Sequence, residues 1–159
     1  MAGTPKRSAG ILAFRRTANG TLEVLLGHPG GPFWKNKDAQ AWSIPKGELA
    51  LDENALAAAR REFREEMGFA IDGEFVELTP VRQSGGKTVH AFAVEADFDA
   101  SKAHSNTFSL EWPPKSGRTH EFPEIDRAEW FPLETALEKI TTGQVPLLQQ
   151  LRERALRRE

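Results

Sequence analysis

Three glutamates stand close together in the middle of the chain, within Arg61–Glu66. Glu62, Glu65 and Glu66 occupy positions i, i+3 and i+4, which lie on one face of an α-helix about a turn apart. Like charges at this spacing repel each other, so a helix by itself gains nothing from them. Mg²⁺ is commonly held by one or two carboxylates together with the phosphates of a substrate. The spacing therefore indicates a divalent-metal site that acts on a phosphorylated compound.

The residues on either side of this cluster predict the helix that positions it. Asn54 is suited to an N-cap, because its side-chain oxygen can accept a hydrogen bond from the first turn. Residues 55–67 contain strong helix formers without Gly or Pro, and Gly68 stands where helices commonly end. Apolar residues recur every three or four positions: Leu56, Ala59, Phe63 and Met67. We expect this stripe to hold the helix against a core while the glutamates point elsewhere.

The rest of the chain mixes strand and helix patterns. Strands are predicted over 8–16, 22–27, 75–83, 87–96 and 128–131, with turn residues that make a hairpin of the first two and another of the next two. Helices are predicted over 132–140 and 145–158, the second with an apolar side of Leu147, Leu148, Leu151 and Leu156. The loops 28–40 and 97–123 are the least regular, and 108–112 is interpreted as an edge strand. Because strands and helices do not alternate strictly, we expect an α+β fold with a mixed sheet.

Composition narrows the class of protein. The chain has 159 residues, of which 28% are charged and 39% hydrophobic, and this is typical of a single globular domain, here 1–159. A net charge of −2 gives no general attraction to nucleic acid or anionic membranes. The absence of cysteine excludes disulfides and thiolate metal sites, and it is compatible with the cytoplasm, where we expect the protein. No apolar run approaches the roughly 18 residues of a membrane span or forms a secretory signal.

The residues around the glutamates also follow a known pattern. Gly47 is followed by five residues and Glu53, and then by seven residues and Arg61–Phe69. This run reads Arg-Glu-Phe-Arg-Glu-Glu-Met-Gly-Phe, so every defined position of the Nudix box is filled over 47–69. The sequence therefore resembles the Nudix hydrolase superfamily. Glu129–Glu134, Glu-Trp-Phe-Pro-Leu-Glu, is similar to that family as well.

The resemblance implies a fold, an activity and roles for the box residues. The fold would be an α/β/α sandwich with a mixed β-sheet between helices. The activity would be cleavage of a pyrophosphate bond in a nucleoside diphosphate-linked substrate, with Mg²⁺ or Mn²⁺ as cofactor. The three clustered glutamates would hold the metal and handle the water, and a backbone carbonyl near Gly47 would complete the metal shell. Glu53 and Arg61 would pair and brace the loop against the helix.

The residue types support the same chemistry independently. Pyrophosphate hydrolysis brings water to a phosphorus crowded by anionic oxygens, so cations that neutralise this charge and a carboxylate that accepts a proton lower the barrier. The residue types do not decide which glutamate is the general base or how many metal ions bind. The alternative is a solvated helix face on which the glutamates pair with Arg60, Arg61 and Arg64.

Residues outside the box are further candidates for substrate or metal binding. Those for the substrate are Lys46, Arg82, Lys87 and Trp112. The cationic side chains could contact phosphates, with ordinary surface positions as the alternative. Trp34 and Trp112 lie in expected loops, where an aromatic ring could stack on a base or simply pack. Glu124 is the first choice for an additional metal ligand, ahead of Glu121 and Asp126.

The box does not determine the substrate. The Tyr found beyond the box in some dinucleoside polyphosphate hydrolases is absent, and so is the Pro of many ADP-ribose pyrophosphatases. The segment 44–48, Ile-Pro-Lys-Gly-Glu, most resembles the diadenosine tetraphosphate and nucleoside triphosphate branch. We therefore expect a pyrophosphohydrolase of these nucleotides, monomeric or homodimeric, with no membrane or stable nucleic-acid partner. The alternatives are a sanitiser of oxidised (d)NTPs and a nucleotide-sensing Nudix-like module without hydrolytic activity.

Overall fold

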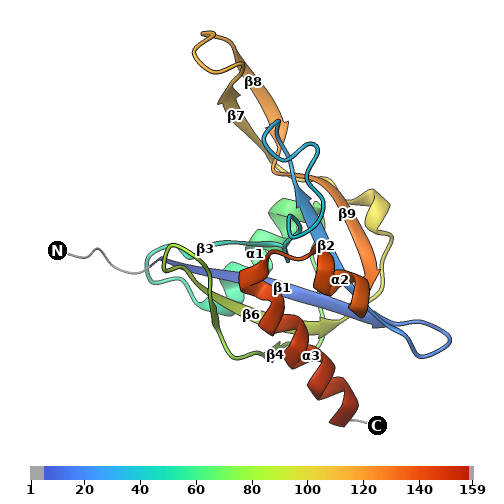
Figure 1. Cartoon of the computed structure of the whole chain (residues 1–159). Helices are drawn as coiled ribbons and strands as arrows, with labels where there is room; N and C mark the ends of the chain where they lie inside the picture. The colour runs from blue at the N-terminus through green and yellow to red at the C-terminus, as the bar shows by residue number, and fades with distance from the viewer. Residues whose placement is uncertain (1–5, 158–159) are drawn as a thin grey trace.

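A mixed β-sheet forms the centre of the molecule, which the computed structural model describes over residues 6–157 (Figure 1). Its strands follow the order β4 (Val76–Glu77), β6 (Thr88–Glu95), β1 (Arg7–Arg16), β2 (Leu22–Pro29) and β9 (Ile125–Pro132). Two short strands join at the side: β3 (Lys46–Glu48) on β1 and β5 (Val81–Arg82) on β6. β1 and β6 are parallel, whereas the other pairs of this sheet are antiparallel. The expected mixed sheet and the hairpin of the first two strands are confirmed.

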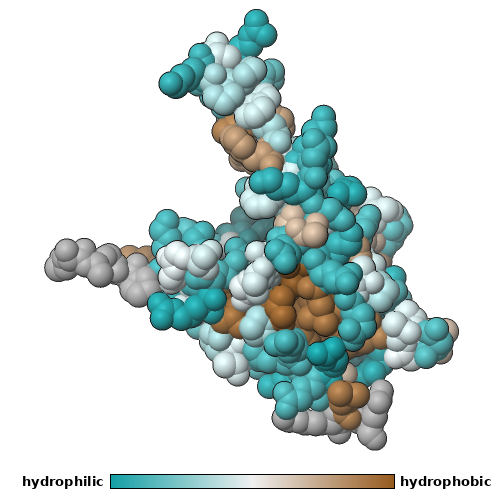
Figure 2. All heavy atoms as spheres, viewed as in Figure 1, coloured by the Kyte–Doolittle hydropathy of each residue, from teal (hydrophilic) through white to brown (hydrophobic). Residues whose placement is uncertain are grey.

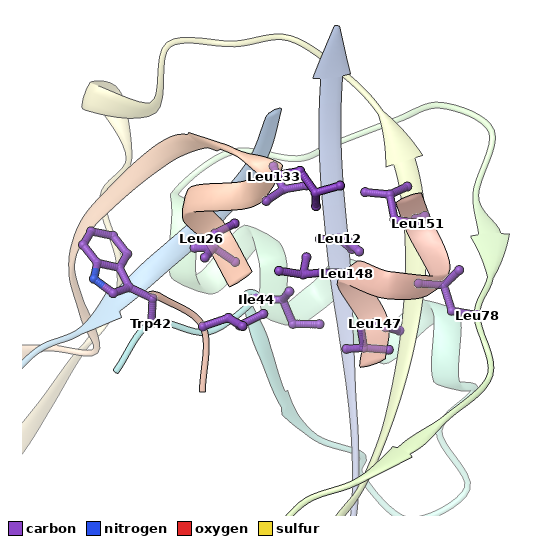
Figure 3. Close-up of a cluster of buried hydrophobic side chains, with 14 of the residues drawn as sticks. Leu12, Leu26, Trp42, Ile44, Leu78, Leu133, Leu147, Leu148 and Leu151 are labelled. Atoms are coloured by element: carbon purple, nitrogen blue, oxygen red, sulfur yellow. The ribbon is translucent and has the colours of Figure 1, made fainter. Parts of the chain in front are cut away.

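Helices cover both faces of the sheet. α1 (Ala55–Met67) packs on one face, where Ile11 of β1 is buried. α2 (Leu133–Lys139) and α3 (Val145–Arg157) cover the other face, where Leu12 of β1 is buried among leucines of both helices (Figure 3). Neighbouring residues of a strand point to opposite faces, so β1 supplies both cores. This is the α/β/α sandwich that the family resemblance implies.

The ends of α1 are those that its sequence predicts. The Oδ1 atom of Asn54 accepts a hydrogen bond from the N–H of Ala57 at 3.2 Å. Gly68 has a φ of 84°, in the left-handed region, and its N–H donates to the carbonyl of Arg64. Of the predicted stripe, Ala59, Phe63 and Met67 are fully buried and Leu56 is partly buried. The helix is therefore anchored by this face. The expectation that all three glutamates point away from the core is wrong for Glu66, which is buried beside the stripe at 6% exposure.

The expected strand over 75–83 is wrong as a single element. β4 and β5 pair with β6 separately, and Leu78–Pro80 lies between them. Pro80 has no N–H to donate to a ladder of hydrogen bonds. Leu78 is buried with the residues under α2 and α3. The break at residues 78–80 therefore interrupts the pairing with β6, and it lets the Leu78 side chain pack into the core under α2 and α3.

The segment 97–123 contains the largest departure from the expected fold. After a 3₁₀ turn, η1 (Ala100–Lys102), strands β7 (Thr107–Glu111) and β8 (Thr119–Pro123) form an antiparallel hairpin of their own. This hairpin stands away from the sheet at the top of Figure 1 and is a narrow projection in Figure 2. A strand is therefore found where 108–112 was interpreted as one, and its only pairing partner among the described residues is β8 in a separate two-stranded sheet, which the sequence did not indicate.

The C-terminal helix follows a second 3₁₀ turn, η2 (Thr142–Gln144). Leu147, Leu148 and Leu151 are buried as expected, but Leu156 is 66% exposed and does not belong to the apolar side. Arg158, the expected end of this helix, lies outside the described residues. Within residues 6–157, the helices lack the length and apolar character that a membrane span requires.

Candidate active site

Arg61 joins α1 to the loop that precedes it. Its Nε and Nη2 donate to the two carboxylate oxygens of Glu53, each at 2.9 Å. The backbone N–H of Ala50 donates to the same carboxylate at 2.9 Å. Hydrogen bonds from Arg61 and then from Ala50 lower the pKa of Glu53 to about 2. Glu53 is therefore ionised at neutral pH and holds the loop closed against the helix.

The same guanidinium reaches two of the helix glutamates. Nη1 of Arg61 donates to Glu62 at 2.8 Å and to Glu65 at 3.4 Å. Nη2 also donates to the backbone carbonyl of Glu48, at 3.3 Å. A positive charge beside both carboxylates offsets the repulsion expected from their spacing. Arg61 thus acts as the local counter-ion of the cluster as well as its link to the loop.

Glu66 is the most buried of the three helix glutamates. The residue is 6% exposed, compared with side-chain exposures of 13% for Glu62 and 38% for Glu65. Burial raises the pKa of Glu66 to about 9, and the charges of Glu62 and Glu124 act in the same direction. Lys46 opposes this shift through its ammonium charge and its backbone N–H. Burial also raises the pKa of Glu62, so both carboxylates are shielded from solvent and lie close to other negative charges.

Glu124 joins the cluster from the junction of β8 and β9. Its N–H donates to the carbonyl of Asn106, and the N–H of Asn106 donates to the carbonyl of Glu65, both at 2.9 Å. Burial and then the charge of Glu65 raise the pKa of Glu124. Asp126 instead lies against the buried His28, with 2.8 Å between Oδ1 of Asp126 and Nδ1 of His28. Glu121 lies within the β7–β8 hairpin. Of the three acidic candidates in this segment, Glu124 is therefore the one that acts on the helix glutamates.

Gly47 allows β3 to approach α1 closely. A β-carbon at this position would lie 2.0 Å from the carboxyl carbon of Glu62 and 2.2 and 2.4 Å from its oxygens. Gly47 pairs with Ala9 of β1, on the face that α1 covers. The carboxylate of Glu62 consequently lies directly against the backbone of Gly47, in the space that the side chain of any other residue at position 47 would occupy.

The carboxylates suit a hard divalent cation. Carboxylate oxygens are the ligands that Mg²⁺ and Mn²⁺ prefer, and burial raises the pKa of Glu62, Glu66 and Glu124 toward their neutral forms. A cation among them would stabilise the ionised forms. Within residues 6–157, no three acidic or histidine side chains are gathered closely enough to ligate an ion as they stand. Arg61 holds the positive charge at Glu62 and Glu65 instead, and a bound cation would take over that role.

The candidate substrate residues divide into two groups. Lys46 is half-buried, and burial followed by the charge of Lys87 lowers its pKa, while the helix glutamates oppose the shift. Lys46 therefore brings positive charge to the carboxylate cluster, and Lys87 lies close enough to Lys46 for the two charges to repel. Arg82 is exposed on the short edge strand β5, and Trp112 lies on the hairpin against Phe33. The structure thus places Lys46 with the glutamates and Lys87 near Lys46, and it leaves Trp112 on a separate projection.

Gln144 is a buried residue that sequence patterns do not reveal. Its Oε1 accepts a hydrogen bond from the N–H of Ile44 at 3.1 Å, and its Nε2 donates to Oγ of Ser43 at 3.0 Å. These bonds hold the backbone that leads through Pro45 to Lys46. Gln144 and Ile44 are 100 positions apart in the chain, so no local spacing links them.

Comparison with known proteins identifies the family. A family model for the NUDIX domain matches residues 4–151. The chain is a member of the Nudix family. It is similar to Nudix hydrolase 5 of Arabidopsis thaliana, with 32% identity over 113 residues that make up 66% of this chain and 35% of that protein. This Nudix chain spans between 8% and 35% of the length of the curated relatives it matches.

Solved Nudix structures share the fold. The NUDIX domain of Shewanella oneidensis NrtR, solved with ADP-ribose, has a TM-score of 0.65 at 16% identity, covering 96% of this chain and 90% of that one. A C. elegans Ap4A hydrolase has a TM-score of 0.58 at 22% identity, covering 93% and 96%. Nudix hydrolases generally use a divalent metal ion such as Mg²⁺. The Arabidopsis relative and the C. elegans structure are both named as hydrolases.

Proposed function

We propose that this Nudix domain cuts a pyrophosphate bond in a nucleoside diphosphate-linked substrate, with Mg²⁺ or Mn²⁺ as its cofactor. One observation carries the proposal: Glu124 from the β8–β9 junction lies near enough to the glutamates of α1 for its charge to act on Glu62 and Glu66 and for that of Glu65 to act on it. Burial and mutual repulsion raise the pKa of three of these carboxylates. A divalent cation that also binds substrate phosphates would stabilise the ionised forms of these carboxylates.

Each part of the cluster has a role in the proposed reaction. The four carboxylates would hold the cation, together with the backbone carbonyl of Gly47 beside Glu62. When bound, the cation supplies neutralisation of the phosphate charge and activation of water. Glu65 is the residue best placed to accept a proton from the attacking water, because its carboxylate is the most exposed of the three on α1. Glu53 and Arg61 position the helix glutamates by tying the preceding loop to the helix.

A nucleoside triphosphate or a dinucleoside polyphosphate is the favoured substrate. Lys46 brings positive charge to the carboxylate cluster and Lys87 lies near Lys46, so both could contact the phosphates of such a substrate. The segment 44–48 resembles that branch of the family, and the C. elegans Ap4A hydrolase has the same fold. Oxidised (d)NTPs, which also carry a triphosphate, are the second substrate class.

The same proposal covers the organisation of the protein. Residues 1–159 form one catalytic domain that works in the cytoplasm as a monomer or homodimer. The net charge of −2 supports the lack of a stable complex with nucleic acid or membranes, and the absence of cysteine fits a reducing compartment.

The test is a substrate panel with resolved products. The chain is incubated with Mg²⁺ or Mn²⁺ and with nucleoside triphosphates, oxidised dNTPs, diadenosine polyphosphates, ADP-ribose or capped RNA. The proposal predicts metal-dependent cleavage of at least one triphosphate or dinucleoside polyphosphate, and no cleavage in EDTA. Tight nucleotide binding without turnover of any compound would instead indicate a nucleotide-sensing module.

A further inference from the structure

The β7–β8 hairpin is apolar on one face. Phe108, Leu110 and Trp112 alternate along one side of the hairpin, and Phe122 of β8 lies opposite Phe108. A two-stranded hairpin is marginally stable by itself, so an apolar face on one requires cover from elsewhere. Figure 2 shows apolar surface on the lower part of this projection.

The loop after β2 supplies part of that cover. The rings of Phe33 and Trp112 meet edge to face, with centroids 5.2 Å apart. Gly31 has a φ of 97°, and a β-carbon there would lie 3.0 Å from the ring of Phe108. Gly30 donates its N–H to the carbonyl of Glu124 at 2.9 Å. The loop 30–37 and the hairpin therefore form one packed unit at the edge of the proposed active site.

This unit exposes aromatic rings that a core would normally bury. Phe33 is 59% exposed and its neighbour Trp34 is 40% exposed. Nζ of Lys37 lies 5.1 Å from the ring centroid of Trp34, as in a cation–π contact. Lys35 and Lys37 form no ion pair among the residues that the structure describes. Exposed aromatic faces next to uncompensated lysines are the combination that stacks nucleobases and contacts their phosphates.

Acidic groups also lie on the hairpin, and they do not face this surface. Glu111 and Glu121 alternate with the apolar residues, so they belong to the opposite face. An oxygen of Glu111 accepts the backbone N–H of Lys115 at the tip. The positive charge of the loop is therefore offset little by the carboxylates of the hairpin.

The unit begins at the carboxylate cluster. Glu124 follows β8 directly, and its N–H donates to the carbonyl of Asn106, next to the start of β7. Trp112 pairs with Arg118, six residues before Glu124, so Trp112 and the Phe33 ring that packs on it lie roughly 20 Å from Glu124 at about 3.3 Å per residue. A second nucleoside joined through a chain of phosphates could reach them.

We propose that Phe33, Trp34 and Trp112, with Lys35 and Lys37, form a second nucleobase site for the distal nucleoside of a dinucleoside polyphosphate. The inference rests on the proposed function for the bond that is cut, while the binding itself requires no turnover. Stacking on the exposed rings distinguishes a substrate with two bases from one with a single base. The loop and hairpin thereby select dinucleoside polyphosphates over nucleoside triphosphates.

The test measures binding in EDTA, where hydrolysis cannot occur. Tryptophan fluorescence of the full chain is titrated with diadenosine tetraphosphate or with ATP. Diadenosine tetraphosphate should quench it more than ATP does, and Trp34→Phe should remove part of that additional quenching. Phe33→Ala and Lys37→Ala should each weaken diadenosine tetraphosphate binding about tenfold, the effect of ~1.4 kcal/mol of stacking or charge, and leave ATP binding unchanged. Leu156→Ala, at another exposed apolar residue, is the matched control and should change neither affinity.

Three results would overturn the inference. Equal losses for both nucleotides would mean that the aromatic rings support a single nucleotide site. A loss confined to a capped oligoribonucleotide would mean that the surface binds RNA. A change of oligomeric state in Phe33→Ala, measured by sedimentation, would mean that the surface contacts a second copy of the chain. Phe33 and Lys37 are both exposed residues of the loop 30–37. The variants Phe33→Ala and Lys37→Ala should therefore fold even if Trp112→Ala does not. The chain could bind diadenosine tetraphosphate selectively in EDTA and yet cleave no nucleotide when metal is added. That result would refute the proposed hydrolysis but not the second base site.

Discussion

The guanidinium of Arg61 binds the carboxylate of Glu53 through two hydrogen bonds of 2.9 Å each, from Nε and from Nη2. This bidentate contact fixes the loop before α1 in both position and direction. The same cation also contacts Glu62 at 2.8 Å, so a change at Glu53 is transmitted to the proposed metal ligands.

Glu53→Gln should lower both activity and acid-dependent stability. Hydrogen bonds lower the pKa of Glu53 from 4.5 to about 2, so its ionised form stabilises the fold above pH 4.5 and this contribution is lost as the pH falls toward 2. The variant should therefore show a flatter dependence of unfolding free energy on pH in that window. Turnover should fall by up to about 100-fold through misplacement of the helix glutamates. Denaturant unfolding at several pH values measures the first effect, with the exposed loop variant Glu74→Gln as control.

Glu66→Gln should stabilise the metal-free protein at alkaline pH. Because burial raises the pKa of Glu66 from 4.5 to about 9, its protonated form favours folding below pH 4.5, and this contribution is lost as the pH rises toward 9. In EDTA, the melting temperature of the wild type should therefore fall between pH 6 and pH 9, and it should fall by more than the melting temperature of the variant does. Excess Mg²⁺ should restore the wild type and have less effect on the variant. Parallel pH profiles in EDTA for Glu66→Gln and the exposed helix control Glu138→Gln would contradict this account.

Glu65→Gln should abolish most of the turnover and leave the fold intact. Glu65 is the most exposed helix glutamate of the cluster, and a general base contributes about 10²- to 10⁴-fold to a rate. We expect kcat to fall within that range while nucleotide affinity in EDTA and the melting temperature stay near the wild-type values. Product analysis over long incubations measures the residual rate. A variant with near-normal kcat would show that another group accepts the proton.

The fold was predictable wherever the information was local. The helix over 55–67 was correct at both ends, because Asn54 and Gly68 are caps that act within one turn. The hairpin of 107–123 was not recognised, because an alternating strand pattern does not name its partner. The expected strand over 75–83 failed at Pro80, whose missing N–H ends a ladder of hydrogen bonds.

The site divides in the same way between local and distant information. The spacing of the glutamates on α1 is readable from sequence, since it depends only on the helical period. Glu124 was the first choice among three acidic residues, but local spacing did not separate it from the others, because the chain path between β8 and β9 decides which carboxylate lies near Glu65. Gln144 gave no signal at all, because its partners Ser43 and Ile44 lie about a hundred positions away.

Gly47→Ala should damage both the fold and the activity. The added β-carbon would lie 2.0 Å from the carboxyl carbon of Glu62, so the strand β3 or the helix must move. Overpacking of this kind costs about 1–3 kcal/mol of unfolding free energy, and displacement of Glu62 should remove most of the turnover. Gly20→Ala is the control: its φ is +84° and nothing lies within 4 Å, so it should lose stability through backbone strain alone. Unchanged activity in Gly47→Ala would show that the close approach is not required.

Gln144→Leu should reduce activity without touching a charged residue of the site. The substitution removes the acceptor for the buried N–H of Ile44 and the donor to Ser43, just ahead of Lys46. An unsatisfied buried donor costs about 1–3 kcal/mol, so the melting temperature should fall. Release of this segment should raise KM for a polyphosphate substrate more than it lowers kcat, because Lys46 loses its position beside the phosphates. Gln149→Leu, at an exposed position of α3, should change neither quantity, and an equal effect of the two variants would refute the bracing role of Gln144.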